Sequence, residues 1–143
     1  CYMENNLTQG RMVLAGRTVS LADVKIPIYN LSAKEDHIAP AKSVFLGCRY
    51  FGGEVEYVLA GSGHIAGVVN HPAAKKYQFW SGGKPEGEFA DWLARAKETP
   101  GSWWPHWQAW VEAKDATRVP ARKPGEKTRV FGDAPGSYVK VRV

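Results

Sequence analysis

The sequence predicts an α/β fold, built from parallel strands with helices and continued by a Trp-rich helical extension. Two observations favour this class. Between residues 24 and 61 a strand pattern, a loop, a helical pattern and a second strand pattern follow one another, which is the order of a βαβ unit in a parallel sheet. Residues 87–114 then carry apolar side chains, several of them Trp, at the spacing of helix faces.

Length and composition limit the class further. With 143 residues, 44% of them hydrophobic, the chain holds one domain with a core, and intrinsic disorder is excluded for most of its length. No apolar run approaches the about 20 residues of a membrane span. The cysteines, Cys1 and Cys48, make no disulfide framework and favour a reducing cytoplasm, and no residues have the CxxC or HxxxH spacing of a zinc site. The chain begins CYMENNL, without an initiator methionine, so we expect a segment of a longer protein.

The first predicted elements are short strands. Residues 12–21 predict two β-prone pieces around a Gly-Arg turn. Residues 24–33 are mostly apolar on both faces, which is typical of a strand buried in a parallel sheet. The polar loop KEDHIAP at 34–40 follows, so it starts at the carboxyl end of a predicted central strand.

A helix and a second strand complete the predicted unit. Pro40 permits a helix start, and apolar residues at near-helical spacing continue as far as Gly52 and Gly53. Residues 54–61 alternate and then become apolar, which predicts a second central strand. A Gly-rich turn that contains His64 comes directly after it.

From residue 76 the pattern changes. We expect helices over 87–98, with Trp92 on the apolar face, and over 100–114, with Ser102 as the N-cap and Pro105 in the first turn. These patterns divide the chain into the C-terminal part of an α/β core at 1–75, a Trp-rich helical extension of the same domain at 76–114, and a basic tail at 115–143.

An acid and a histidine follow the two predicted central strands. Asp36 comes after the first strand and His64 after the second. If the strands are parallel, both side chains emerge at the edge of the sheet where ligands bind. A carboxylate fixes the tautomer of a general-base histidine and stabilises its imidazolium form. The alternative is a packed core histidine beside a solvated loop aspartate, and the pattern does not separate Asp36 from Glu35 and His37.

The chain lacks a recognisable nucleophile. A nucleophile elbow has the pattern G-x-S-x-G or its cysteine equivalent between a strand and a helix. Cys48 lies within the predicted helix without that pattern, so we expect a small buried residue there. Ser62 lies in A-G-S-G-H, which also differs from the elbow. The chain therefore supplies at most the acid and the histidine of a triad.

Four motifs in order point to a family. They are ENNL at 4–7, KEDHI at 34–38, GSGHIAGVVN at 61–70 and PGSWWPHW at 100–107. Together they resemble the C-terminal part of polyhydroxyalkanoate synthases, most like class I, enzymes that polymerise (R)-3-hydroxyacyl-CoA into polyester and release CoA. The resemblance extends from Asn5 to about Trp110 and continues weakly to PGSYVK near the end.

The resemblance implies an α/β-hydrolase fold with a Cys–His–Asp triad. Its acid maps to Asp36 and its histidine to His64, whereas its nucleophilic cysteine lies upstream, outside this chain. Neither Cys1 nor Cys48 takes that role. The implied activity is acyl transfer without cofactor or metal, and this segment alone is expected to be inactive.

The resemblance also implies partners and a location. They are the CoA substrate, the growing polyester, the upstream catalytic half of the same protein and a second copy in a homodimer, in the cytoplasm at the surface of polyester granules. The net charge of +5 fits anions, but no RNA-binding motif or Gly-rich phosphate loop is present, so no nucleic-acid partner is expected. Two alternatives stay open: an α/β-hydrolase that gives the acyl group to water (a thioesterase, esterase or polyester depolymerase), and a non-catalytic module that binds granules or a partner through its Trp face and basic tail.

Overall fold

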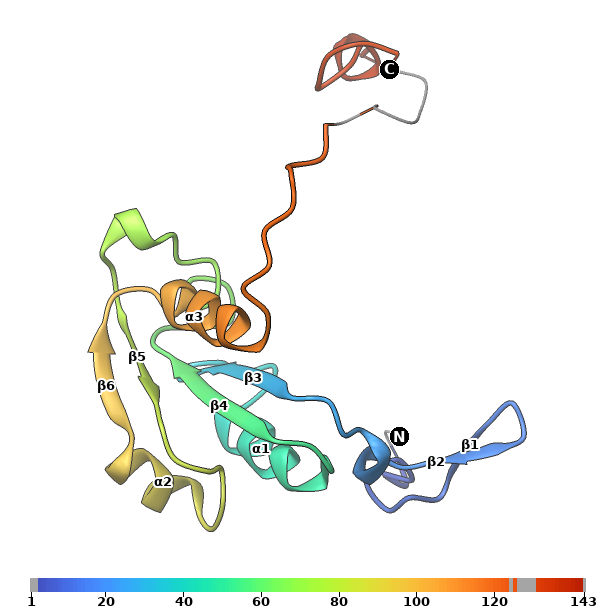
Figure 1. The fold of residues 1–143 in the computed structure, drawn as a ribbon, viewed down its shortest axis with the longest axis vertical. Coiled ribbons are helices and arrows are strands. Elements are labelled where there is room, and N and C mark those ends of the chain that lie inside the picture. The colour runs from blue at the N-terminus through green and yellow to red at the C-terminus, as the bar shows by residue number, and fades with distance from the viewer. Residues whose placement is uncertain (1–2, 124, 126–130, 143) are drawn as a thin grey trace.

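A four-stranded mixed sheet forms the centre of the molecule (Figure 1). The computed structural model describes residues 3–123, 125 and 131–142. The strands stand in the order β3 (Ile28–Ala33), β4 (Val55–Ala60), β5 (Gln78–Ser81) and β6 (Lys97–Pro100). The α-helices are α1 (Ala41–Gly47), α2 (Phe89–Arg95) and α3 (Trp104–Lys114).

The predicted βαβ unit is present in β3, α1 and β4. The two strands pair in parallel, from Ile28 opposite Val55 to Ala33 opposite Ala60. The first strand is shorter than the predicted 24–33, since Pro27 precedes it and has no N–H for a ladder. Its partner β4 agrees with the predicted 54–61 to within one residue at each end.

Helix α1 starts after Pro40, as predicted, and ends at Gly47. Cys48 lies at its end, where a 3-10 turn (Cys48–Tyr50) begins, rather than in the middle of the helix. The chain then passes close to the segment before β3. A Cβ on Gly52 would lie 1.9 Å from the carbonyl oxygen of Ala22, so only glycine fits this close approach.

Two antiparallel strands, β5 and β6, continue the sheet beyond β4, and no sequence pattern predicted them. They lie in segment 76–114, which was expected to be helical, so this segment is partly sheet. The predicted helix over 87–98 ends at Arg95, and β6 starts at Lys97. Trp80 Nε1 donates to Glu98 Oε2 over 3.1 Å between paired residues of the two strands. Strands of four residues are too short to show a period of two in the sequence.

The helices cover both faces of the sheet. On one face α1 and α2 bury a core that includes Phe45, Tyr57, Leu59, Trp80 and Trp92. The predicted apolar face of α2 is confirmed, because Phe89, Leu93 and Ala96 pack against this core together with Trp92. Helix α3 covers the other face, as Figure 1 shows.

Helix α3 is attached to that second face through rings and polar contacts. Tyr29 on β3 hydrogen-bonds to His106 over 2.9 Å, and its ring contacts those of Trp103 and Trp110. The helix begins at Trp104 with Pro105 in its first turn, and Ser102 Oγ accepts the N–H of Trp104 over 3.1 Å. The N-cap residue is therefore Trp103 rather than the predicted Ser102, which lies one residue earlier and still satisfies one N-terminal N–H group.

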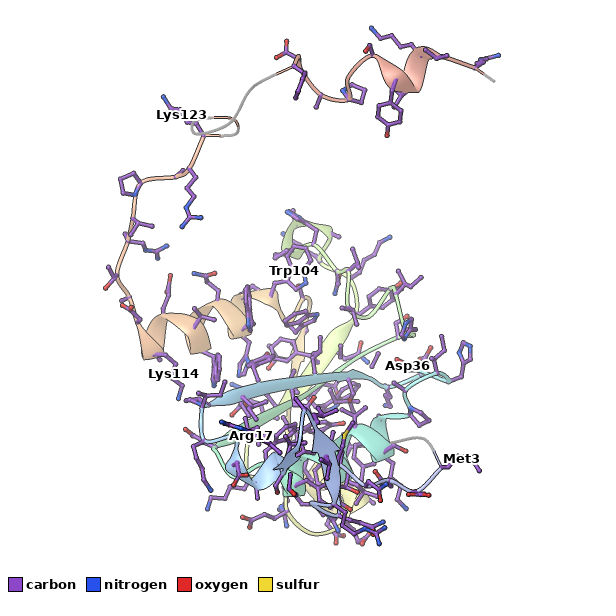
Figure 2. The ribbon with its side chains drawn as sticks, turned by 90° about the vertical axis from the view of Figure 1, so that its right-hand side faces the viewer. Met3, Arg17, Asp36, Trp104, Lys114 and Lys123 are labelled. Atoms are coloured by element: carbon purple, nitrogen blue, oxygen red, sulfur yellow. The ribbon has the colours of Figure 1, made fainter. Side chains whose placement is uncertain are left out.

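The two ends of the chain lie away from the sheet. At the N-terminal end, β1 (Met12–Leu14) and β2 (Arg17–Val19) pair antiparallel, which confirms two short strands there. At the other end residues 115–123 run exposed away from α3 (Figures 1 and 2). Cys1 and part of the basic tail (126–130) fall outside the described residues. In the part of the chain that is described, no helix is long and apolar enough to cross a membrane.

Candidate active site

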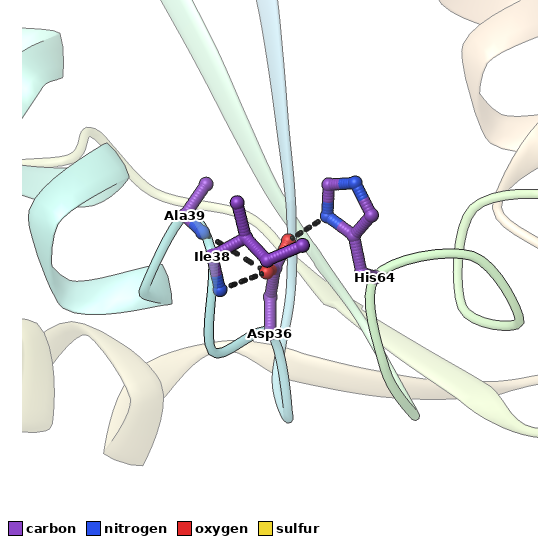
Figure 3. A network of polar contacts seen from close by, with 4 residues as sticks. All are labelled: Asp36, Ile38, Ala39 and His64. Atoms are coloured by element: carbon purple, nitrogen blue, oxygen red, sulfur yellow. Dashed lines mark hydrogen bonds and ion pairs between the residues drawn. The ribbon is translucent and has the colours of Figure 1, made fainter.

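Asp36 lies in the loop that leads from β3 to α1. Its Oδ1 accepts two backbone hydrogen bonds, from Ile38 N over 2.8 Å and from Ala39 N over 3.0 Å (Figure 3). These bonds form because an aspartate side chain is short enough to reach the N–H groups two and three residues on. They fix the carboxylate just before Pro40 and the start of α1. Its second oxygen is left for another partner.

His64 lies in the turn that follows β4. Gly61 N donates to Gln78 O over 2.7 Å, which ties the start of this turn to β5. Glu35 N donates to Ser62 O over 3.0 Å, which ties the turn to the loop of Asp36. The two loops are therefore fastened to each other by their backbones at the carboxyl edge of the sheet.

The two side chains meet at this edge. His64 Nδ1 lies 2.7 Å from Asp36 Oδ2 (Figure 3). The Asp36 side chain is 7% exposed and that of His64 is 47% exposed. Since an ionised carboxylate only accepts, Nδ1 of His64 carries the proton of this bond. In the neutral ring Nε2 is then unprotonated and able to accept a proton.

The carboxylate of Asp36 is held in its ionised form. The backbone N–H of Ala39 contributes most, and the hydrogen bond with His64 comes next, and together they lower the pKa of Asp36 from 3.8 to about 2. An anion that stays ionised at any ordinary pH stabilises an imidazolium beside it. The site can therefore take up a proton on His64 and keep the resulting charge paired.

The geometry distinguishes among the acids and histidines of the loop. Asp36 contacts His64, whereas Glu35 and His37 are exposed and make no side-chain contact with His64 among the described residues. The D-x-x-A-P spacing from Asp36 to Pro40 would have been a usable signal, since an aspartate in a turn commonly accepts from the backbone N–H groups two or three residues on.

Cys48 is a core residue, as the sequence predicted. It is buried, its Sγ accepts from Asn30 Nδ2 over 3.2 Å, and burial raises the pKa of its thiol. A thiol with a raised pKa is a poor nucleophile at neutral pH. Cys48 also belongs to the core under α1 rather than to the edge that carries His64.

Three apolar side chains close in sequence to the pair are exposed. Ile38, two residues after Asp36, is 66% exposed, Ile65, directly after His64, is 71% exposed, and Val69, five residues after His64, is 68% exposed. Such side chains are normally covered in a finished active site. Within the described ranges, no group of three or more His, Cys, Asp and Glu lies close enough together to hold a metal ion.

A second polar cluster, which the sequence did not reveal, lies at the other end of β3. His106 links Tyr29, at 2.9 Å, with Glu56, at 3.9 Å, under α3. Burial and then the charge of Glu56 raise the pKa of Tyr29, so its hydroxyl stays protonated. The cluster depends on the docking of α3 on the sheet, and no local pattern could have indicated it. It attaches α3 to the sheet away from Asp36 and His64.

The fold and the pair define a class of protein: an α/β protein with a carboxylate–histidine pair at the carboxyl edge of its parallel strands, where such sheets bind ligands. No family model matches the chain. Its similarity to individual proteins is high. It is 68% identical over 142 residues to the poly(3-hydroxyalkanoate) polymerase subunit PhaC of Rhizobium meliloti, covering 99% of this chain and 23% of that protein.

Two further relatives carry the same kind of name. The chain is 54% identical over 144 residues to the poly(3-hydroxyalkanoate) polymerase of Methylorubrum extorquens and 35% identical over 144 residues to the subunit PhaC of Cupriavidus necator. Each match covers 99% of this chain and 24% of the relative. Over nearly its whole length the chain is thus similar to the C-terminal part of poly(3-hydroxyalkanoate) polymerases, which confirms the resemblance. It spans about a quarter of the length of these curated relatives.

Proposed function

We propose that this chain forms the C-terminal part of the catalytic domain of a poly(3-hydroxyalkanoate) polymerase, an acyltransferase. In this proposal His64 is the general base and Asp36 its supporting acid. The contact of 2.7 Å between Asp36 Oδ2 and His64 Nδ1 carries the proposal, because it leaves Nε2 of a half-exposed histidine free to take a proton. The similarity to the polymerases of three organisms supplies the reaction class.

The reaction proceeds in two acyl transfers. Nε2 of His64 takes the proton of a cysteine supplied by the upstream part of the protein, and the thiolate attacks the thioester carbonyl of 3-hydroxyacyl-CoA. The C–S bond to CoA breaks, and the imidazolium returns its proton to the CoA thiolate. His64 then takes the proton of the 3-hydroxyl group of an acyl unit, whose oxygen attacks the carbonyl of the acyl-cysteine. The C–S bond to the cysteine breaks, and the imidazolium returns its proton to the cysteine thiolate. The ester bond lengthens the polyester by one unit.

His64 rather than Asp36 acts on the hydroxyl group in this proposal. Both oxygens of Asp36 already have partners: two backbone N–H groups on Oδ1 and the histidine on Oδ2. Its pKa of about 2 also makes it a very weak base. We assign Asp36 to orienting the ring and pairing the imidazolium charge.

The finer features belong to the same proposal. The described core and edge strands form the C-terminal end of an α/β-hydrolase fold, and the upstream part completes the sheet. The full-length protein acts as a homodimer in the cytoplasm, at the surface of polyester granules. Without the upstream cysteine this chain alone has no activity, since Cys48 is buried beneath α1.

The full-length protein with 3-hydroxybutyryl-CoA as the substrate tests the proposal. Free CoA thiol and turbidity are followed together for wild type, His64→Ala and His37→Ala. We expect release of CoA with growing turbidity in wild type and in the His37→Ala control, and loss of both in His64→Ala. Release of CoA into a solution that stays clear would mean that water is the acceptor and the protein is a hydrolase. An active His64→Ala protein would remove His64 from the mechanism.

Asp36→Asn tests the supporting role of the acid. The amide keeps the shape but presents an N–H or an uncharged oxygen to the ring, so the tautomer is no longer fixed and the imidazolium loses its counter-charge. We expect kcat to fall by roughly 10⁴-fold, as for such changes in other triads, with CoA release as the assay. Glu35→Gln in the same loop is the matched control and should keep wild-type kcat. Equal kcat values for wild type and Asp36→Asn would contradict the role.

A further inference from the structure

The turn that carries His64 is held to the start of α3 by two indole groups. Trp103 Nε1 and Trp104 Nε1 both donate to the backbone carbonyl oxygen of Val68, over 3.1 and 3.0 Å. A carbonyl oxygen has two lone pairs and each indole has one N–H, so the two donors saturate this acceptor. Figure 2 shows Trp104 at the start of α3.

Val68 is closely linked to His64 through the backbone. Gly67, directly before Val68, donates its N–H to the carbonyl oxygen of Gly63, directly before His64, over 3.0 Å. Val69, directly after Val68, donates its N–H to the carbonyl oxygen of Ile65, directly after His64, over 2.8 Å. A shift of the Val68 peptide therefore pulls on both neighbours of the histidine. The turn behaves as one unit between its two supports, the sheet edge on one side and the indoles on the other.

Helix α3 is a firm support for the indoles. The Tyr29–His106 hydrogen bond of 2.9 Å attaches its first turns to β3, and the Trp103 ring contacts that of Tyr29 at 6.0 Å between centroids. At the far end Lys114 Nζ lies 3.4 Å from Glu54 Oε2, next to the start of β4. Helix α3 thus attaches the Val68 carbonyl to β3 and β4, the two strands whose following loops carry Asp36 and His64.

We propose that Trp103 and Trp104 are positioning residues for His64: their indole N–H groups hold the Val68 carbonyl and so keep Nε2 of His64 aimed at the reacting atoms. The inference rests on the proposed function, because it assigns the two residues a part in acyl transfer. It extends that function to a helix that supplies no reacting group.

Because both indoles donate to the same carbonyl oxygen, we expect single and double Trp variants to differ strongly in kcat. In the full-length protein, Trp103→Phe or Trp104→Phe leaves one donor on the carbonyl, and we expect kcat to fall at most about threefold. The double variant leaves the carbonyl without a donor, and kcat should fall by about tenfold to a hundredfold, since a misplacement of about 1 Å is worth roughly 100-fold. KM should change by less than about twofold because the substrate contacts are intact. The combined loss thus exceeds the product of the single losses.

Trp107→Phe is the matched control. Trp107 lies on the same helix, touches the Trp103 ring at 6.3 Å between centroids, and its indole N–H makes no hydrogen bond among the described residues. We expect wild-type kcat for this variant. If it lost as much activity as the double variant, general weakening of α3 would explain the result and the proposal would fail.

A spectroscopic measurement separates positioning from stability. The downfield N–H resonance of His64 Nδ1, assigned by its absence in His64→Asn, reports the bond to Asp36 without any turnover. In the double variant we expect this resonance to broaden or exchange faster, and in Trp107→Phe to stay as in wild type. A double variant with wild-type kcat, or one with a lower Tm but an unchanged resonance and kcat, would overturn the inference.

Two further experiments cover a double variant that does not fold and a wild-type protein that releases no CoA. If the double variant does not fold, both indoles are replaced by 3-benzothienylalanine, which keeps the ring shape and has sulfur in place of the N–H; the same loss of kcat is expected, and wild-type kcat contradicts the inference. If wild-type protein releases no CoA, the proposed function fails, whereas the His64 resonance still decides whether the indoles position the ring.

Discussion

At the scale of single residues, the site depends on the hydrogen bonds that the carboxylate of Asp36 accepts. Three hydrogen bonds converge on its carboxylate, from Ile38 N, Ala39 N and His64 Nδ1. Each of them favours the charged form, so the same contacts that orient the histidine also keep the acid ionised. The residue pattern alone could not separate Asp36 from Glu35 and His37, and only the family resemblance pointed to Asp36, because the choice depends on which side chain reaches the N–H groups before Pro40.

Because of these hydrogen bonds, we expect Asp36 to contribute to the stability of the folded protein in a way that is lost at acidic pH. The pKa of Asp36 is lowered from 3.8 to about 2 in the folded protein, so its stabilisation is fully present above about pH 4 and is lost as the pH falls toward 2. The urea midpoint of wild type should exceed that of Asp36→Asn at pH 5, and the difference should shrink steadily between about pH 4 and pH 2. Glu35→Gln should show no such change. A difference that stays constant across this range would contradict the account.

At the scale of elements, the parts with local sequence patterns were predictable and the parts fixed by long-range packing were not. The βαβ unit of β3, α1 and β4 has strand and helix periods in the sequence, and it places the acid and the histidine at one edge. Strands β5 and β6 are each four residues long, and they form because β4 offers an edge on which Phe79 and Trp80 are buried. The indole bonds to Val68 likewise require that α3 already lies on the sheet.

Substitution by alanine is expected to have opposite effects on stability at two glycines, Gly67 in the turn after β4 and Gly47 in α1. A Cβ on Gly67 would lie 2.2 Å from the carbonyl oxygen of Gly61, so Gly67→Ala must push the His64 turn open and should cost about 1–3 kcal/mol of unfolding free energy. Gly47 lies in α1 with ordinary helical φ of −63° and nothing within 4 Å of its Cβ position, so Gly47→Ala should stabilise by about 0.5–1 kcal/mol. Denaturant unfolding of both variants checks this, and a stable Gly67→Ala protein with normal activity would contradict the tight turn.

At the scale of the whole molecule, the chain has the features of an incomplete unit. Among the described strands β3 pairs with β4 alone, so its other edge is unpaired. Exposed apolar side chains, Ile38, Ile65 and Val69, lie next to the candidate pair. An open edge and uncovered apolar residues are both hazards that a finished fold avoids. The relatives are about four times as long as this chain. In the proposed function, an upstream part of the same protein covers this surface and brings the cysteine to His64.

Mixing two separate fragments tests most directly whether this chain supplies the base of the reaction. The upstream fragment is combined with this chain as wild type or as His64→Ala, co-elution verifies that they bind, and release of CoA from 3-hydroxybutyryl-CoA is measured. We predict no release by either fragment alone, release by the complex with the wild-type chain, and none by an equally well-formed complex with His64→Ala. Release at the same rate with the His64→Ala chain, or by the upstream fragment alone, would contradict the account.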